Sequence, residues 1–269
     1  RQGRAPSLVF DAYAAGGSPT DPSGAVGPNH YFTVFNTGFI IYDKSGVALT
    51  GQLAVENIFS SGGCCDLTVS YDNAADRWVV SYLFSSGGAE IAVSDGPDPL
   101  TTGWNLYTIS AIQDYQKLSV WSDGYYITEN TGGTSKIWAL ERDQMLAGNP
   151  AAQIQGFNLP GIVTNGFFSP QAFNVSNSDL PATGSLPIVY MYDNNWGGGG
   201  SDHIKLWEVD VDWVTSGNSS ISGTPQQIPV SAFNSLFDNG SFSNLAQPSG
   251  GISIDALQAT IMNQAQFRR

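Results

Sequence analysis

Aspartate residues recur at one position of a repeated pattern in this sequence. Asp21, Asp66 and Asp114 each come just before a short segment in which β-branched or aromatic residues alternate with other residues. If these segments are the innermost strands of sheets arranged around a central channel, the three carboxylates lie around one mouth of that channel. Clustered oxygen ligands suit Ca²⁺, whereas an isolated Asp often caps its own turn. The sequence leaves both interpretations open.

A second set of oxygen ligands surrounds a run of glycines. Asp193, Asn195 and Asp202 flank Gly197–Gly200. A glycine-rich loop with alternate Asp and Asn oxygens can wrap a cation, although the spacing is not that of an EF-hand. The alternative is a plain hairpin loop, so calcium is one of two hypotheses here.

The only two cysteines, Cys64 and Cys65, are adjacent. Their Cα atoms are about 3.8 Å apart across a trans peptide, whereas ordinary disulfides span roughly 4.4–6.8 Å. A vicinal disulfide is therefore strained, and strain tends to be kept at functional sites. Two free thiols are the alternative, and an extracellular location favours the bond.

Few residues suit catalysis. Ser-His-Asp chemistry needs a His beside a nucleophile, and the chain has two histidines and no G-x-S-x-G motif. A polysaccharide lyase needs a base and a group that neutralises a uronate. The candidates at corresponding positions of the repeat are His30, Tyr31, Arg77 and Tyr125. Lys and Arg total only 10, which counts against an anionic substrate, so we expect a binding protein rather than an enzyme.

Tryptophans are candidates for stacking on a sugar. Most of the seven lie in alternating segments, where core packing explains them better. Trp196 lies beside the glycine run, and we expect its side chain to be exposed. Trp121 is the second candidate for ligand contact.

The composition indicates which elements position these residues. The chain has 31 Gly and 14 Pro, with 12% aromatic and 12% charged residues, as in proteins of many short strands. The net charge of −13 disfavours nucleic acid and favours divalent cations. No apolar run is long enough for a transmembrane helix, and the first residues resemble a processed mature start. We therefore expect an extracellular or cell-surface protein.

A repeat of 47 residues organises the chain. Tyr31 and Tyr125 are equivalent and lie 94 positions apart, and half that offset leads from Tyr31 to Trp78. Each copy predicts four strands, and four strands in about 40–50 residues are typical of a propeller blade. We therefore predict a single all-β domain over 1–269, a β-propeller with blades near 20–60, 66–110, 114–160 and 167–232.

The two ends of the pattern differ from the rest. Leu8–Tyr13 predicts a lone strand, and 252–269 predicts a helix because Ala, Gln, Met and Leu are frequent there. Four blades are few for a closed ring, so we expect a larger ring of, for example, seven blades, completed by further chain. That chain would be a C-terminal fragment of the same precursor.

The sequence also resembles a family of secreted bacterial β-propeller proteins, mostly without assigned function. The matching segments are DPSGAVGPNHYF from Asp21, FIIYDKSG from Phe39, SYDNAADRWVVS from Ser70, IAVSDGPDPLTTGWNLY from Ile91, DYQKLSVWSDGYYIT from Asp114, ALERDQML from Ala139 and YDNNWGGGGSDHIKLWEVDVDW from Tyr192. The resemblance implies the fold and not an activity. The adjacent cysteines depart from the family pattern.

We therefore expect a non-catalytic, calcium-stabilised module that binds a glycan or a protein surface. One alternative is a polysaccharide lyase or glycoside hydrolase with its site at the channel mouth. Another is a structural subunit of an extracellular assembly, which needs a large complementary apolar patch.

Overall fold

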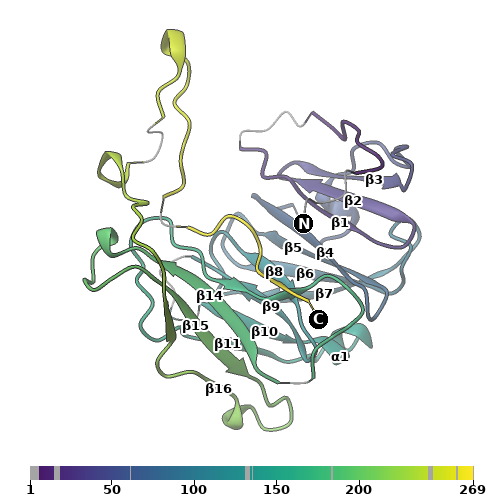
Figure 1. The fold of residues 1–269 in the computed structure, drawn as a ribbon. Helices are drawn as coiled ribbons and strands as arrows, with labels where there is room; N and C mark the ends of the chain where they lie inside the picture. Colours follow the sequence, from purple (N-terminus) through teal and green to yellow (C-terminus); the bar gives the residue numbers. More distant parts are fainter. Residues whose placement is uncertain are drawn as a thin grey trace. The chain divides into compact units, whose positions relative to one another are not determined.

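The protein is all-β, with several antiparallel sheets (Figure 1). The computed structural model describes residues 6–14, 19–60, 62–130, 134, 136–182, 184–241, 245–258 and 260–268. The chain divides into two compact units. The first comprises Arg1–Gln113, Arg142–Ala152 and Ser176–Asp179, and the second comprises Asp114–Glu141, Gln153–Val175 and Leu180–Arg269. Within the described ranges, no helix is long and apolar enough to cross a membrane.

The first unit holds two sheets whose strands follow one another in chain order. The three-stranded sheet contains β1 (Ser23–Val26), β2 (His30–Phe35) and β3 (Gly38–Asp43). The four-stranded sheet contains β4 (Cys65–Asp72), β5 (Arg77–Leu83), β6 (Ala89–Ser94) and β7 (Trp104–Ile109). Two short helices accompany them, η1 (Val55–Asn57) and α1 (Arg142–Leu146).

Aromatic side chains fill the core between these two sheets. Phe32 of β2 and Trp78 of β5 are completely buried, and their ring centroids lie 5.5 Å apart. The Trp78 indole donates a hydrogen bond to the Pro97 carbonyl at 2.9 Å, so its polar atom is satisfied. Gly27 lies so close to this ring that a Cβ atom there would be 2.7 Å from it. The β1–β2 turn therefore needs a glycine at this position.

The second unit holds a regular and a less regular sheet. The first contains β8 (Lys117–Val120), β9 (Gly124–Thr128), β10 (Ile137–Glu141) and β11 (Ile154–Phe157). The other contains β12 (Gln171–Ala172), β14 (Leu186–Tyr192), β15 (His203–Asp210), β16 (Ser220–Ile221) and β17 (Gln226–Pro229), the last two both pairing with β15. A short parallel pair joins β13 (Asn174–Val175) to β18 (Gln266–Phe267). Four 3₁₀ turns are η2 (Asn194–Trp196), η3 (Ser216–Asn218), η4 (Asp238–Gly240) and η5 (Pro248–Gly250).

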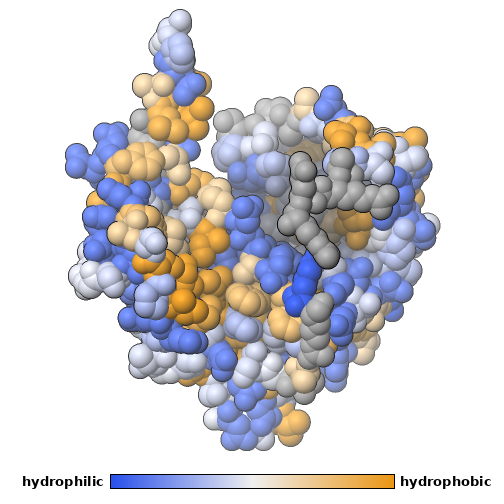
Figure 2. Space-filling view, in the orientation of Figure 1, coloured by the Kyte–Doolittle hydropathy of each residue, from blue (hydrophilic) through white to orange (hydrophobic). Residues whose placement is uncertain are grey.

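A hairpin-like excursion leaves the second unit after β17. Leu245 and Ile254 pair through a single antiparallel bridge, and η5 lies at the tip. The excursion extends away from β14 and β15 (Figure 1). Figure 2 shows a polar tip above apolar side chains. Ile252, which follows the η5 turn, is 94% exposed.

The strands expected in the second and third repeats are present. Each of these two repeats contains four strands, as the sequence predicts: β4–β7 in one and β8–β11 in the other. The prediction succeeded because alternation and turn residues coincide in both repeats.

The helix expected over 252–269 was a wrong prediction. The described part of this segment is extended, and it ends in β18, which pairs with β13. Gln264 donates a hydrogen bond from its side-chain amide to the Leu118 carbonyl, and Phe267 packs edge to face against Trp121 with ring centroids 5.2 Å apart. These contacts with the sheet outweigh a weak helical propensity.

The lone strand expected at Leu8–Tyr13 is not formed either. This segment is attached through its rings instead of its backbone. Phe10 packs on Tyr42 with centroids 5.3 Å apart, and Tyr13 stacks on Phe35 at 5.2 Å.

Candidate functional site

An unusual backbone conformation marks the start of the first strand in three of the sheets. Asp21, Asp66 and Tyr115 all have positive φ, at 42°, 57° and 54°. Non-glycine residues seldom adopt this region, and Asp does so more readily than most. The repeated turn therefore explains why aspartate recurs there. In the third copy the special position is Tyr115, one residue after the expected Asp114.

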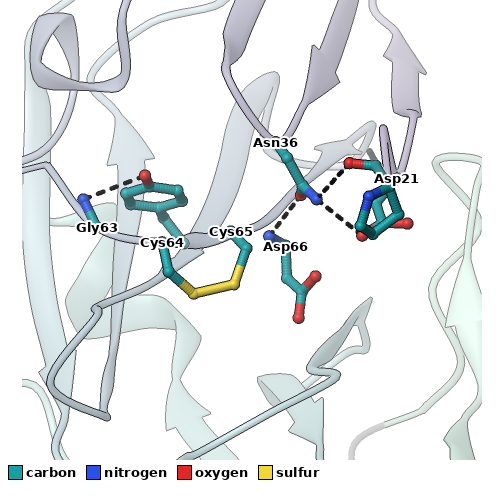
Figure 3. The surroundings of a disulfide bond; sticks show 8 residues. Asp21, Asn36, Gly63, Cys64, Cys65 and Asp66 are labelled. Atoms are coloured by element: carbon teal, nitrogen blue, oxygen red, sulfur yellow. Dashed lines mark hydrogen bonds between the residues drawn. A yellow bond between two sulfur atoms is a disulfide. The ribbon is translucent and has the colours of Figure 1, made fainter. Parts of the chain in front are cut away.

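In the first unit, the amide of Asn36 connects the first strands of the two sheets (Figure 3). Its Nδ2 donates to Asp21 Oδ2 at 2.8 Å and to the Pro19 carbonyl at 3.1 Å. Its Oδ1 accepts the backbone N–H of Asp66 at 2.8 Å. Asn36 thus joins the turn before β1 to the bulged start of β4. No pattern in the sequence had marked Asn36 as a site residue.

Directly before Asp66, the structure places a disulfide between Cys64 and Cys65, with Cα atoms 3.7 Å apart (Figure 3). Cys64 is exposed and Cys65 is half-buried. Strand pairing shifts register between Cys65 and Thr68. The disulfide therefore lies at a β-bulge, where a strand can redirect a side chain.

The loop that carries the disulfide is anchored on both sides. The Gly63 N–H donates to the Tyr82 hydroxyl at 3.1 Å, and the Cys64 N–H donates to the Leu83 carbonyl at 3.0 Å. Upstream, Ser60 donates from its backbone and its hydroxyl to the buried Glu90 carboxylate, at 2.8 and 2.9 Å. Burial raises the pKa of Tyr82, so its hydroxyl stays protonated at neutral pH. We call Asp21, Asn36, Cys64, Cys65 and Asp66 the disulfide edge.

The acidic residues beside the glycine run serve as structural caps. Asp193 accepts hydrogen bonds from Asn195 through Oδ1 and from Ser235 through Oδ2, at 2.5–2.9 Å. Asp202 accepts from the backbone N–H groups of Asn194 and Phe233, at 2.9 and 2.8 Å. Both carboxylates are buried. They tie η2 to the segment after β17.

These hydrogen bonds also control the charge of Asp193. Burial alone raises the pKa of a carboxyl group, but the hydrogen bonds from Ser235 and Asn195 outweigh burial and lower the pKa of Asp193. The carboxylate is therefore ionised at neutral pH. Across the described residues, no group of three or more His, Cys, Asp or Glu side chains could hold a metal ion. Calcium binding stays a prediction at both acidic sites.

The two tryptophan candidates have structural contacts. Trp121 is 2% exposed and donates to the Gly184 carbonyl at 3.2 Å, so it is a core residue and the prediction of ligand contact was wrong. Trp196 is half-buried. Its indole donates to Ser235 Oγ at 2.9 Å, and its ring lies against Gly240. The Trp196 side chain, which we expected to be exposed, is therefore only partly exposed.

The four lyase candidates are held by local contacts. His30 Nε2 lies 3.8 Å from Asp98 Oδ1. Arg77 donates to the carbonyls of its own turn, Ala75 and Asp76, at 3.1 and 3.0 Å. Tyr125 is completely buried, and the Tyr31 ring covers Gly24. In the described part of the first unit, no hydrogen bond or ion pair joins His30, Tyr31 and Arg77 to one another.

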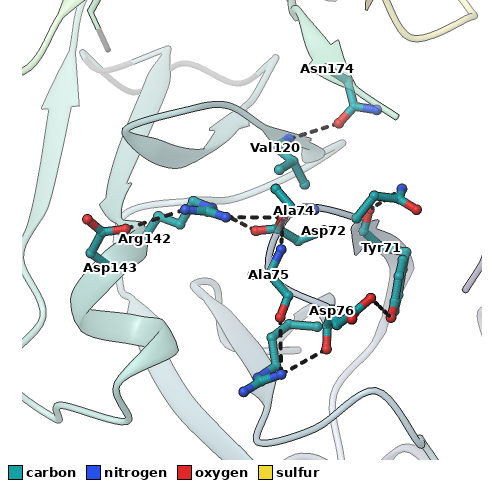
Figure 4. Close-up of polar contacts among 11 residues, drawn as sticks. Tyr71, Asp72, Ala74, Ala75, Asp76, Val120, Arg142, Asp143 and Asn174 are labelled. Atoms are coloured by element: carbon teal, nitrogen blue, oxygen red, sulfur yellow. Dashed lines mark hydrogen bonds and ion pairs between the residues drawn. The ribbon is translucent and has the colours of Figure 1, made fainter. Parts of the chain in front are cut away.

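A buried ion pair in the first unit was not predicted (Figure 4). Asp72, at the end of β4, is completely buried and accepts from the N–H groups of Ala74 and Ala75, both at 3.1 Å. Arg142 of α1 donates to the same carboxylate from Nε at 2.7 Å and from Nη2 at 3.2 Å. The turn after Asp72 can be recognised in the sequence. Arg142, the partner of Asp72, lies 70 residues later in the chain, so the pairing could not be predicted. This two-point contact fixes α1 against β4.

Comparison with known proteins gives no family for this chain. No family model matches it, and no curated protein matches it.

Proposed function

We propose that the chain forms part of a β-propeller. The antiparallel sheets β4–β7 and β8–β11 support this architecture, because each has four strands in chain order, as in one blade. The sequence period of 47 residues and the repeated positive φ at Asp21, Asp66 and Tyr115 support it further. A larger ring, such as one of seven blades, is part of the same proposal.

We propose that this propeller is a secreted or cell-surface module that binds a glycan without catalysis. The disulfide edge is the observation that carries the proposal. It combines hydrogen-bonding carboxylate and amide groups with an exposed disulfide on an anchored backbone. A few polar groups on an anchored backbone suit the recognition of a polyhydroxylated ligand. A protein surface is the alternative ligand, and calcium the proposed cofactor.

The binding proposal is tested with immobilised glycans, followed by titration calorimetry with any glycan that binds. Asp66→Ala should weaken binding about tenfold or more, since it removes a charged hydrogen-bonding group. Asp179→Ala is the matched control, because Asp179 is exposed but lies outside the disulfide edge. Equal loss in both variants, or glycan binding that neither variant changes, would contradict the assignment of this edge. Binding to proteins alone would favour the alternative ligand.

One observation favours a polysaccharide-acting enzyme as the second candidate. The His30 ring has a carboxylate neighbour, Asp98, at 3.8 Å, and a carboxylate can orient a catalytic imidazole. Release of reducing or unsaturated sugar ends by the wild type, but not by His30→Gln, would support this candidate over a binding module.

A further inference from the structure

The Cys64–Cys65 pair has a chemistry that glycan binding does not use. Disulfides exchange with thiols when a thiolate can reach one of the sulfur atoms. Cys64 is exposed, so it is accessible to a small reductant. The pair is also the only source of thiols in the chain. Reduction of this disulfide therefore creates a pair of neighbouring thiols, which the oxidised chain lacks.

We propose that the reduced Cys64–Cys65 pair binds a thiophilic metal ion through its two thiolates. A dithiol reductant first opens the bond. The disulfide takes up two electrons and two protons to become two thiols, while the dithiol is oxidised to its cyclic disulfide. A divalent soft cation then displaces both thiol protons, forming two metal–sulfur bonds and releasing two H⁺. Thiolates select soft cations over calcium or magnesium.

The anchored backbone is the first argument for this site. The N–H groups of Gly63, Cys64 and Asp66 donate hydrogen bonds to oxygen atoms of Tyr82, Leu83 and Asn36, respectively, and none of these bonds involves sulfur. These bonds persist when the disulfide opens, so the two thiols stay neighbours. A pre-positioned pair of ligands loses less conformational entropy on binding.

The local charge is the second argument. The left-handed backbone at Asp66 interrupts the alternation of side chains along β4. Figure 3 shows the Asp66 carboxylate pointing the same way from the backbone as the sulfur atoms. Glu56 adds another carboxylate close to the loop, 2.5 Å from where a Cβ atom of Gly62 would lie. Negative charge beside the two cysteines attracts a cation to the site. It also repels thiol compounds in solution that carry a negative charge.

Cadmium is a suitable probe, and the experiment uses the whole chain. The protein is reduced with a dithiol, separated from it without oxygen, and titrated with Cd²⁺, followed by metal analysis and native mass spectrometry. We expect about one Cd²⁺ per reduced chain and none on the oxidised chain. Asp66→Asn should weaken cadmium affinity roughly threefold to tenfold, as expected for loss of one nearby charge.

The variant Cys64→Ser/Cys65→Ser is the control and should bind no cadmium under either condition. Equal binding by this variant, equal binding by the oxidised chain, or no binding by the reduced wild type would overturn the proposal. Loss of the β-sheet circular dichroism signal on reduction would overturn it too, because the site needs the anchored loop. None of these results depends on whether the protein binds glycans.

Discussion

The guanidinium of Arg142 donates two hydrogen bonds to the carboxylate of Asp72, which is completely buried. The backbone of the β4–β5 turn donates two more to the same carboxylate. A buried charge with this many donors is stable only while the whole set is intact. The pair therefore makes a turn in one sheet depend on a short helix far along the chain.

Removing one partner of this pair should be costly. Arg142→Ala is expected to lower the free energy of unfolding by about 3–5 kcal/mol, because it leaves the Asp72 charge buried and without its cation. Urea denaturation measures the change. Asp143→Ala is the control, since the exposed Asp143 carboxylate meets Arg142 only at 3.4 Å and should contribute under about 1 kcal/mol. Similar losses in both variants would show that the buried pair has no special role.

The Asn36 amide should protect the Asp66 backbone from hydrogen exchange. Asn36→Ala removes the acceptor at 2.8 Å, so exchange at the Asp66 amide should accelerate and unfolding free energy should fall by about 1–2 kcal/mol. Asn36→Asp keeps an acceptor for Asp66 but places a carboxylate beside Asp21. It should keep the Asp66 amide protected while still losing stability. Unchanged exchange in Asn36→Ala would disprove the connection.

A methyl group at Gly27 should disturb the core of the first unit. A Cβ atom there would lie 2.7 Å from the Trp78 ring and 3.1 Å from Tyr71, so Gly27→Ala should cost about 1–3 kcal/mol in unfolding free energy. Gly51→Ala is the matched control, because nothing lies within 4 Å of its Cβ position. Thermal unfolding of the two variants gives the comparison. Equal melting temperatures would mean that the ring moves aside without penalty.

The lowered pKa of Asp193 should make stability fall in acid. Its folded-state pKa lies below the unfolded value, so its stabilising effect is complete above the unfolded pKa of about 3.9 and is lost as pH falls through the folded pKa. Asp193→Asn lacks this titration. The stability of the variant should therefore fall less steeply below about pH 4 than that of the wild type, in urea unfolding measured from pH 7 to pH 2. Parallel curves would contradict this assignment.

Calcium binding at the predicted acidic positions has a direct test. If the ion binds the folded chain, added Ca²⁺ raises the melting temperature and a chelator lowers it again. We expect a shift of a few degrees that Mg²⁺ does not reproduce and that Asp66→Asn reduces. A melting temperature that is indifferent to calcium and chelator would remove calcium from the proposed function.

The regular sheets were predictable because their information is local. In β4–β7 and β8–β11, alternation and turns fall within a few residues of each other, and the predicted strands formed. The C-terminal segment could not be predicted in this way. Its extended form depends on Gln264 and Phe267 meeting Leu118 and Trp121, which are about 146 residues earlier. Local helix propensity contains no information about contacts between residues so far apart in the chain.

The candidate site was predictable only in part, for a similar reason. The repeat located Asp21 and Asp66, and adjacency marked the cysteines, but the amide that joins them belongs to Asn36 on the β2–β3 turn. The acidic residues at 193 and 202 were noticed for their chemistry. Their hydrogen-bond donors include Ser235 and Phe233, which lie in an irregular segment that no sequence pattern marks.

The excursion between Leu245 and Ile254 also offers a practical position for labelling. Its tip at Pro248–Gly250 is exposed and forms a local turn, and the bridge between Leu245 and Ile254 closes its base. Exposed tips of this kind tolerate inserted residues and attached groups better than sheet strands do. A fluorophore or affinity tag placed there would report on the protein without replacing any residue of the disulfide edge or of the sheet cores.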